Sequence, residues 1–386
     1  MRNLVLEMEF FDGIYEINNL KEIKRALNAL LEVREEQLKH QIINIILKDL
    51  KEKFSDNSYK LSVNIAYDNS KTVGFVIAQI NPFFRSYGKK CATFGWLRAQ
   101  SLEICKKLMN TCEKFAIENY FRKIRGPINS PKGLGGIGAQ IEGFNEELLY
   151  GVAFNPPTIP TFLDKLGYKR DAEYNCVYVS KKTWRQGKNL DENVRIGYLP
   201  LNEMVARKDE FLNLISGAFD FMLPDHSTNR AKDVINQLAA VPREYYKLPH
   251  NFNPRDYYNF PAVVEAWESC DLENVMIWAP LAFDRKTDEL IGVIFCLPDL
   301  YQLWTGKRIS RVNTDTAIVD PRYTGKGIFS SLNNLVQTTM GFFGVDYVEG
   351  CYIWNKNEKA VQSIFPHSKP IRKHIVFQKR LRAHKK

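Results

Sequence analysis

The residues best suited to chemistry in this sequence lie in a basic turn that contains glycine. Thr314–Val319 is a run of mostly β-branched and small residues, which is typical of a buried strand. Arg322, Gly325, Lys326 and Gly327 follow it, and apolar residues then recur with helical spacing. Glycine lets a ligand approach the backbone, and the first turn of a helix presents unpaired N–H groups and partial positive charge. A strand, a glycine turn and a helix in this order predict a pyrophosphate site.

Residues 312–343 resemble the acyl-CoA-binding motif of the GNAT acyltransferase superfamily. The family pattern is R/Q-x-x-G-x-G/A between a central strand and a helix, and Arg322, Gly325 and Gly327 match its defining positions. The resemblance implies that acetyl-CoA or a longer acyl-CoA binds as co-substrate, with no metal. The contacts that it implies are Thr316, Ile318, Val319, Arg322, Tyr323, Thr324, Gly325, Lys326, Gly327 and Ile328. Asn357 and Ala360 fit the family's N-x-x-A pattern, so Asn357 is expected beside the pantetheine arm.

Two carboxylates near this motif are the candidate catalytic residues. Asp315 lies on the strand that enters the motif, and Glu349 lies on the next predicted strand, Tyr347–Tyr352. Deprotonating an alkylamine with a pKa of about 10.4 at pH 7 costs roughly 4 to 5 kcal/mol. A carboxylate at the site would assist an amine nucleophile in this step. Either residue could instead be a solvent-facing residue at a strand edge.

The acid that protonates the leaving thiolate is not evident in the sequence. In the GNAT family a tyrosine on the helix after the fifth strand often has this role, but the corresponding predicted helix, Asn357–Phe365, has Ile364 or Phe365 in its place. Cys351 and His367 lie nearby and suggest a nucleophilic pair, which is a much weaker hypothesis. The other histidines show no metal-ligand spacing.

Composition places the chain among ordinary globular proteins. Its 386 residues allow two domains, and 45% of them are hydrophobic. The seven cysteines are scattered without a CxxC pair, which argues against a disulfide framework and against a zinc site. No apolar run approaches the length of a membrane span, and the acidic residues near the N-terminus make a poor signal peptide. We therefore expect a cytoplasmic protein.

The formal net charge is +10, and part of it lies in the C-terminal segment. The clustered basic residues there are Arg372, Lys373, Lys379, Arg380, Arg382, Lys385 and Lys386. Such a balance suits a polyanionic partner, which could be CoA, a nucleic acid or an anionic membrane surface. The alternative is a solvated basic surface with no specific partner.

The first half of the chain has the element order of a GNAT domain without its phosphate loop. A strand, or a hairpin around Asp12-Gly13, is expected at residues 2–17, followed by two helices in 20–54, the first of which Asn18 or Asn19 could cap. Strands at 59–67, 72–80 and 92–96 and a helix at 101–119 follow. Leu97–Leu102, the expected counterpart of the phosphate loop, contains no glycine. Bulky residues there would keep the backbone from a pyrophosphate, so we expect no cofactor in this half.

Residues 124–168 give the resemblance more detail. The elements R-G-P-x-N-S, E-G-F, N-P-P and L-G-Y resemble a bacterial and archaeal group of uncharacterised GNAT proteins described as YghO-like. The glycine-rich part, Ile124–Phe144, lacks the G-K-[ST] of a P-loop. It is either a loop that shapes an acceptor or acyl pocket, or turn chemistry alone.

A polar stretch at residues 181–193 divides the chain, and the same element order restarts after it. A strand is expected at 194–199, a helix at 201–221, another helix at 231–238 and a hairpin at 275–298. Tyr245–Pro261 is rich in aromatic residues and prolines, and is either a lid over an acceptor pocket or a packed surface excursion. A last strand is expected at 375–381.

These patterns predict an α/β protein, with α+β mixed sheets, made of two GNAT-like domains in tandem. Residues 1–188 would form a degenerate first domain, and residues 189–386 a second domain that binds acyl-CoA. The function that follows is acyl transfer from CoA to a small-molecule or peptide amine. Two alternatives stay open: a Fem-type aminoacyl transferase that uses charged tRNA, and a non-catalytic protein that binds acyl-CoA.

Overall fold

The computed structural model describes residues 12–179, 189–245, 253–256, 260–271, 273–357, 360 and 368–381. The side chains of residues 216, 217, 219–222 and 254 are outside the description. The predicted aromatic run at 245–261, the predicted helix at 357–365 and His367 therefore lie largely or wholly outside the described residues.

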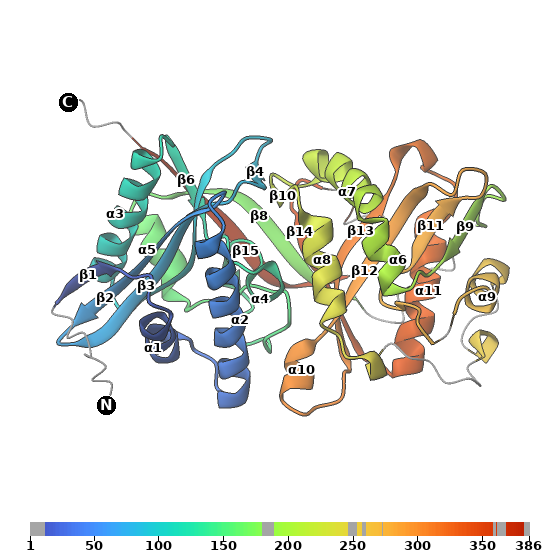
Figure 1. The fold of residues 1–386 in the computed structure, drawn as a ribbon, viewed down its shortest axis with the longest axis horizontal. Coiled ribbons are helices and arrows are strands. Elements are labelled where there is room, and N and C mark those ends of the chain that lie inside the picture. The colour runs from blue at the N-terminus through green and yellow to red at the C-terminus, as the bar shows by residue number, and fades with distance from the viewer. Residues whose placement is uncertain are drawn as a thin grey trace.

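A mixed sheet of 13 strands runs through the whole described part of the chain, as Figure 1 shows. Its order is β1-β2-β3-β5-β6-β15-β8-β14-β13-β12-β11-β9, and β7 pairs with β15 outside this path. Most neighbours are antiparallel, while β5 with β6 and β13 with β14 are parallel. The two parallel pairs occupy equivalent places on either side of the centre.

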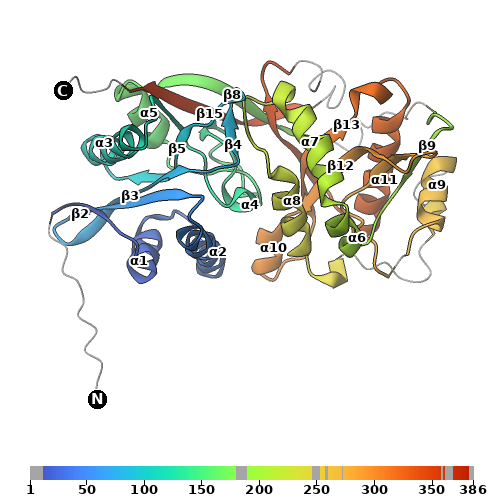
Figure 2. The same cartoon turned by 45° about the horizontal axis from the view of Figure 1, so that its top comes forward.

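The first half contributes two layers of helices around its strands (Figure 2). Helices α1 and α2 pack against β2 and β3 on one face, and α3 covers the other face together with α5. The strands are β1 (Gly13–Glu16), β2 (Lys60–Asp68), β3 (Lys71–Ile80), β4 (Phe84–Ser86), β5 (Ala92–Ala99), β6 (Lys123–Gly126), β7 (Ala139–Glu142) and β8 (Lys169–Tyr178). The helices are α1 (Leu20–Leu30), α2 (Glu36–Ser55), α3 (Leu102–Glu118), α4 (Lys132–Gly135) and α5 (Thr158–Lys165).

The second half repeats the order with its own strands and helices. The strands are β9 (Val194–Gly197), β10 (Asp225–Ser227), β11 (Leu281–Asp284), β12 (Leu290–Pro298), β13 (Arg311–Val319), β14 (Tyr347–Trp354) and β15 (Lys369–Arg380). The helices are α6 (Leu201–Ala206), α7 (Lys208–Met222), α8 (Arg230–Ala239), α9 (Pro261–Glu268), α10 (Leu300–Trp304) and α11 (Ile328–Phe343). None of the described helices is both long enough and apolar enough to cross a membrane.

Local sequence signals account for the helices of the first half. Asn19 caps α1, and its side-chain oxygen accepts hydrogen bonds from the backbone N–H groups of Lys21 and Glu22, as predicted. Helix α3 buries Cys105, Leu108 and Cys112 on one face, and Cys105 and Cys112 are both 0% exposed. These two thiols are core packing residues.

Some element predictions for the second half were wrong in detail. The single helix expected at 201–221 is two helices, α6 and α7, which meet at Arg207. The first strand of the hairpin expected at 275–298 begins only at Leu281. Residues 275–280 are buried but do not form a regular strand. In the first half, helix α5 and strand β8 were not predicted.

The last strand of the chain lies in the middle of the sheet. Strand β15 pairs with β6 and β8 of the first half, and β8 in turn pairs with β14 of the second half. Each half therefore supplies one strand that extends the strands of the other. The expected division into 1–188 and 189–386 stays a prediction, since residues 180–188 lie outside the described part.

A buried arginine joins the two halves beside this exchange. Arg125 on β6 is 0% exposed, and its Nε and Nη2 atoms donate to the two carboxylate oxygens of Asp225 at 2.9 and 2.6 Å. Its Nη1 donates to Asp171 on β8 at 2.6 Å and to Gln378 on β15 at 3.0 Å. The fork geometry of a guanidinium satisfies all these acceptors at once.

We predict that Arg125→Met lowers the free energy of unfolding by about 3 to 5 kcal/mol, because Asp225 would stay buried without a cation. Urea unfolding followed by circular dichroism measures this. The control is Arg170→Met, which breaks the exposed Arg170–Asp164 pair on the same sheet and should cost at most about 1 kcal/mol. Equal losses in the two variants would contradict the role of Arg125.

Candidate functional site

The strands β13 and β14 run side by side only over their first residues. Their parallel register spans Arg311–Thr314 on β13 and Tyr347–Gly350 on β14. From Asp315 onward the two strands diverge, while β13 stays paired with β12 on its other edge. No backbone hydrogen bond among the described residues closes this gap. The Asp315 carbonyl accepts a hydrogen bond from Arg230 Nη2 at 3.1 Å, and the edge of β13 that faces β14 is left free for a ligand along residues 316–319 in the described part of the chain.

The helix after β13 begins without a side-chain cap. Gly327 is its N-cap residue, with φ of 74°, and no side chain accepts a hydrogen bond from its first turn in the described part of the chain. Gly325 has φ of 86°, and a Cβ added there would meet no atom within 4 Å. Both positive φ angles favour glycine. The first N–H groups of a 16-residue helix are therefore available to an anion beside an open turn.

The charged residues of the turn are held by carboxylates of the protein. Arg322 is 61% exposed at its side chain and pairs with Asp320 and Glu289, each at 2.6 Å. Lys326 Nζ lies 3.6 Å from Asp191. These exposed pairs are weak, so they can exchange for a phosphate at little cost. Tyr323 donates its hydroxyl hydrogen to Asp284 at 2.8 Å, and Thr324 is exposed.

The equivalent gap in the first half is filled by the chain itself. The parallel pair β5–β6 ends at Thr93 and Arg125, and the segment after β6 then stays beside β5. The N–H of Ile128 donates to the Phe94 carbonyl at 2.7 Å, and the N–H of Trp96 donates to Asn129 Oδ1 at 2.6 Å. These bonds occupy the strand edge that is free in the second half.

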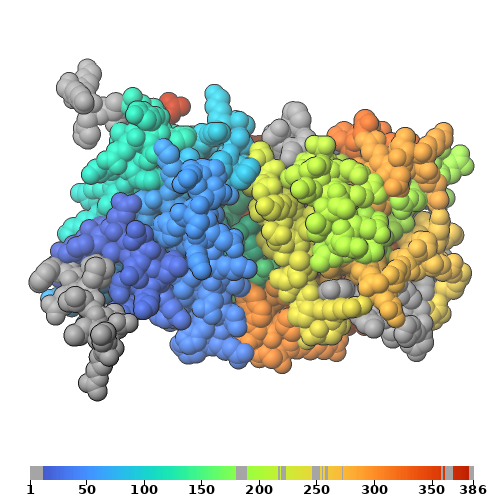
Figure 3. Space-filling model, in the orientation of Figure 1, coloured from blue at the N-terminus to red at the C-terminus, as the bar shows by residue number. Residues whose placement is uncertain are grey.

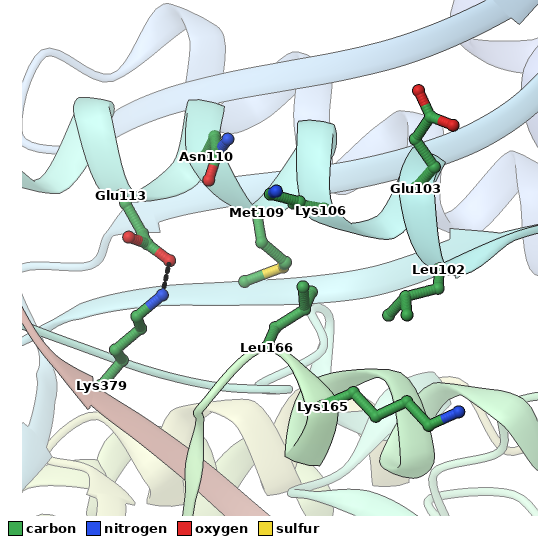
Figure 4. A pocket seen from close by; sticks show the side chains of 9 residues that line it. All are labelled: Leu102, Glu103, Lys106, Met109, Asn110, Glu113, Lys165, Leu166 and Lys379. Atoms are coloured by element: carbon green, nitrogen blue, oxygen red, sulfur yellow. Dashed lines mark hydrogen bonds and ion pairs between the residues drawn. The ribbon is translucent and has the colours of Figure 1, made fainter.

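The helix of the first half is also capped by its own sequence. The Ser101 side chain accepts a hydrogen bond from the N–H of Ile104 in the first turn of α3. A hollow of about 670 Å³ lies between α3 and α5 (Figure 4). Its cations include Lys379, which is paired with Glu113 at 2.8 Å, and β5 contributes none of its lining residues. This hollow does not reach a free strand edge.

The first candidate base, Asp315, lies where β13 and β14 diverge and is 8% exposed. It is ion-paired with Lys132 of α4, and with Arg230 of α8 at 3.1 Å. Burial alone would raise the pKa of Asp315, but Arg230 and Lys132 outweigh burial and hold this pKa well below its ordinary value. A carboxylate held in this way is a weak proton acceptor, and its predicted role as a base is untested.

The second candidate base, Glu349, has the opposite character. It is 0% exposed, accepts a hydrogen bond from Arg372 Nε at 2.9 Å, and accepts another from the Tyr347 hydroxyl at 2.8 Å. Burial, and after it negative charge on the Cys176 sulfur, raise the pKa of Glu349 to about 7, although Arg372 and the Tyr347 hydroxyl act to lower it. Asp315 and Glu349 share no partner in the described structure. Both residues lie near the point where β13 and β14 diverge, but their side chains contact different residues.

The remaining predicted contacts follow β13 and the residues after β14. Thr316 and Ile318 are 3% exposed, while Val319 is half-buried. Ile328 is buried in the first turn of α11. Asn357 Oδ1 accepts a hydrogen bond from the N–H of Ala360 at 3.2 Å, as an N-cap residue does. Contact of these residues with CoA stays a prediction.

A thiol–imidazole pair lies at the centre of the sheet and was not predicted. Cys176 Sγ is 3.8 Å from His374 Nδ1, and His374 Nε2 donates to the Ala153 carbonyl at 3.0 Å. The donor atoms of Cys176, Glu349 and Cys351 lie within 4.8 Å of one another. Because Arg372 already neutralises Glu349, this group is a poor cation site. The Cys351–His367 hypothesis falls outside the described residues at His367.

Three of the four described basic residues of the C-terminal segment pair with acidic residues. Arg372 is buried against Glu349. Lys373 pairs with Glu142 at 2.9 Å, and Lys379 pairs with Glu113. These ion pairs engage three of the basic residues on which the prediction of a polyanionic partner was based.

Comparisons with known proteins support the fold. No protein-family model and no curated protein matches the sequence. A tandem GNAT protein from the clavulanic acid biosynthesis pathway has a TM-score of 0.54 to this structure at 11% identity, over 95% of this chain and 98% of that chain. A fungal multi-domain GH3 β-N-acetylglucosaminidase with a GCN5-related glucosamine N-acetyltransferase region gives 0.56 at 12% identity, over 95% of this chain and 38% of that chain.

A third solved structure agrees with these two. It is a conserved Enterococcus faecalis protein described as a probable N-acyltransferase, with a TM-score of 0.52 at 8% identity, over 96% of this chain and 73% of that chain. At these identities the likeness shows the fold alone. The predicted fold class, a tandem of two GNAT-like units with mixed sheets, is confirmed. The narrower resemblance to YghO-like proteins stays a prediction.

We predict that Asp315→Asn lowers the free energy of unfolding by about 3 to 5 kcal/mol at pH 7, since the buried Lys132 would lose the carboxylate with which it is ion-paired. The pKa of Asp315 is lower in the folded protein than in the unfolded chain. The loss should therefore be full above pH of about 4 and shrink as the pH falls below it.

Urea unfolding of wild type and variant across pH measures this effect. The control Asp164→Asn, which removes the carboxylate of an exposed ion pair, should change stability by less than about 1 kcal/mol. Normal stability of Asp315→Asn with lost acyl transfer would instead support the predicted role of Asp315 as a base.

Proposed function

We propose that the second half of this tandem GNAT-fold chain binds an acyl-CoA along β13 and α11 and transfers the acyl group to an amine. The observation that carries this proposal is the difference between the two halves. In the first half Ile128 and Asn129 fill the gap between the parallel strands, and Ser101 caps the helix. In the described part of the second half, neither the gap nor the helix end has such an occupant.

The turn before α11 has the features that a pyrophosphate needs. The uncapped N–H groups of the first turn would donate to phosphate oxygens, and the open space at Gly325 lets the phosphates approach the backbone. Lys326 and Arg322 would exchange their carboxylate partners for the phosphates. Arg322 offers several N–H donors in a planar fork, which suits a phosphate better than a point charge does.

The free edge of β13 would hold the pantetheine arm by backbone hydrogen bonds, as the GNAT resemblance implies. A bound acyl-CoA supplies an activated thioester. The amine nitrogen forms a bond to the acyl carbon, the carbon–sulfur bond breaks, and the sulfur leaves as a thiolate that takes up a proton. The strand junction at Asp315 is where this exchange would occur.

The two candidate carboxylates would have different roles at this junction. We infer that Asp315 acts mainly by holding Lys132 and Arg230 in place, because a carboxylate between two cations is not basic. Glu349, with its pKa raised to about 7, is the better match for a base at neutral pH. Its side chain is enclosed, so it would act through a relay that includes Tyr347.

We predict that Gly325→Val weakens CoA binding by at least about ten-fold, because a β-branched side chain would block the approach of the phosphates. Isothermal calorimetry with CoA measures this. The variant should also lose about 1 to 2 kcal/mol of stability through strain at positive φ.

The matched control is Gly88→Val. Gly88 also has a positive φ, of 72°, with no atom within 4 Å of an added Cβ, but it lies in an exposed turn beside β4. It should show the same strain with unchanged CoA affinity. Equal CoA affinity in both variants would contradict the cofactor assignment.

A turnover assay distinguishes an acyltransferase from a protein that only binds acyl-CoA. Wild-type protein given acetyl-CoA and a panel of primary amines should release free CoA thiol, detected with a thiol reagent, at a rate that depends on the amine. CoA binding without thiol release for any amine or acyl chain would favour the non-catalytic alternative. Salt-sensitive retention of tRNA without CoA binding would favour the aminoacyl transferase alternative.

A further inference from the structure

A cleft between the two halves leads to the strand junction. It has a volume of about 770 Å³ and lies between α2 of the first half and α8 of the second, with α4 at its base. In Figure 3 the surfaces of α2 and α8 face each other across the middle of the molecule. The aromatic side chains of Tyr59, Phe83, Tyr150 and Trp304 line part of it. A volume of this size accommodates a small molecule.

Most charged groups deep in this cleft already have partners. Lys53 pairs with Asp49 at 2.8 Å and also contacts Ser130, whose hydroxyl donates to Asp49 at 2.9 Å. Lys132 pairs with Asp315 below the cleft. These contacts leave little unbalanced positive charge deep in the cleft.

Two hydrogen-bond acceptors on α8 have no donor among the described residues. Gln237 is 9% exposed, and its Oε1 atom is buried without a hydrogen-bond partner. Asp233 lies one helical turn earlier, so the two side chains share a face of the helix. The Asp233 carboxylate feels Lys132, Lys53 and Arg230 only through longer-range electrostatic interactions. Both groups line the cleft.

The buried Gln237 carbonyl oxygen without a donor is costly in the free protein. Asp233 beside it is half-buried and has no ion-pair partner among the described residues. A protonated primary amine has three N–H donors and one positive charge, and would satisfy both acceptors together. The carboxylate supplies the opposite charge, and the amide oxygen a second acceptor. A neutral or anionic ligand would leave at least one of these needs unmet.

The cleft also has the right connection to the proposed acyl site. Lys132 lines the cleft and contacts Asp315, which marks the point where β13 and β14 diverge. A molecule in the cleft would thus lie beside Lys132, which contacts Asp315 at the strand junction. An acyl donor along β13 and an amine in the cleft would meet at this junction.

We propose that this cleft binds the acyl acceptor, a small molecule with a primary ammonium group held by Asp233 and Gln237. This inference rests on the proposed acyl transfer for its biological role, and on the cleft alone for amine binding. The aromatic rings at the cleft walls would contact the apolar part of the acceptor.

The main test measures amine binding directly and in turnover. The probes are 2-phenylethylamine, L-lysine and spermidine, titrated into wild-type protein, Asp233→Asn and Asp209→Asn by calorimetry without acyl-CoA. Asp209 is an exposed aspartate in the first turn of α7, outside the cleft lining, and serves as the matched control. We expect at least one probe to bind wild type and the control equally, and to bind Asp233→Asn about ten-fold more weakly or worse.

In turnover with acetyl-CoA, Asp233→Asn should raise the KM for the amine by a similar factor and leave the KM for acetyl-CoA unchanged. If wild type releases thiol but Asp233→Asn has a normal amine KM, the cleft assignment is overturned and the proposed function stands. If the probes bind through Asp233 but no thiol is released, the cleft assignment stands and the proposed function fails. No binding of any probe to wild type at millimolar concentration overturns the inference.

Two further readouts separate a ligand role from a structural one. Burial raises the pKa of Asp233 to about 6, so amine affinity should fall as the pH drops through about 6 in wild type, and not in Asp233→Asn. The charged groups around it are Asp49 and Lys53 of α2, Lys132 of α4 and Arg230 of α8.

Gln237→Met removes a buried acceptor that has no donor, so it should leave the Tm of the free protein unchanged or higher while it weakens amine binding. A lower Tm with normal amine affinity would show that Gln237 is structural, and would remove it from the proposed site.

Discussion

One buried carboxylate, ion-paired with two cations, fixes the position of β13 relative to α4 and α8. Asp315 on β13 is ion-paired with Lys132, from α4 of the first half, and with Arg230, from α8 of the second half. An uncompensated charge at this depth would cost several kcal/mol, so the strand and the two helices must keep their relative places. As a result Lys132, which lines the cleft between α2 and α8, is held beside Asp315, where β13 and β14 diverge.

The two halves share a fold and differ in what the chain does at equivalent places. Each half has a parallel strand pair that is paired over only a few residues, β5–β6 in the first half and β13–β14 in the second. A long helix follows the first strand of each pair, α3 after β5 and α11 after β13. In the first half the chain fills the gap with Ile128 and Asn129, and in the second half the gap is free among the described residues. Function therefore depends on local occupancy of a site, which the fold alone does not determine.

Local signals in the sequence were enough to predict the strand, turn and helix around Gly325 and the Asn19 cap, because each depends on neighbouring residues. The exchange of β15 into the first half was not predictable in this way, since its partners on β6 are about 250 residues away in the chain. The same holds for Asp233 and Gln237. Their importance comes from a lack of donors, which only the packed structure reveals.

The most direct measurement is hydrogen–deuterium exchange of the protein with and without CoA. We predict slower exchange of the backbone amides at residues 316–319 and in the first turn of α11, where the strand edge and the helix end gain acceptors from the ligand. The first turn of α3, which Ser101 already caps, should be unaffected. Protection at α3 with no change along β13 and α11 would contradict the account.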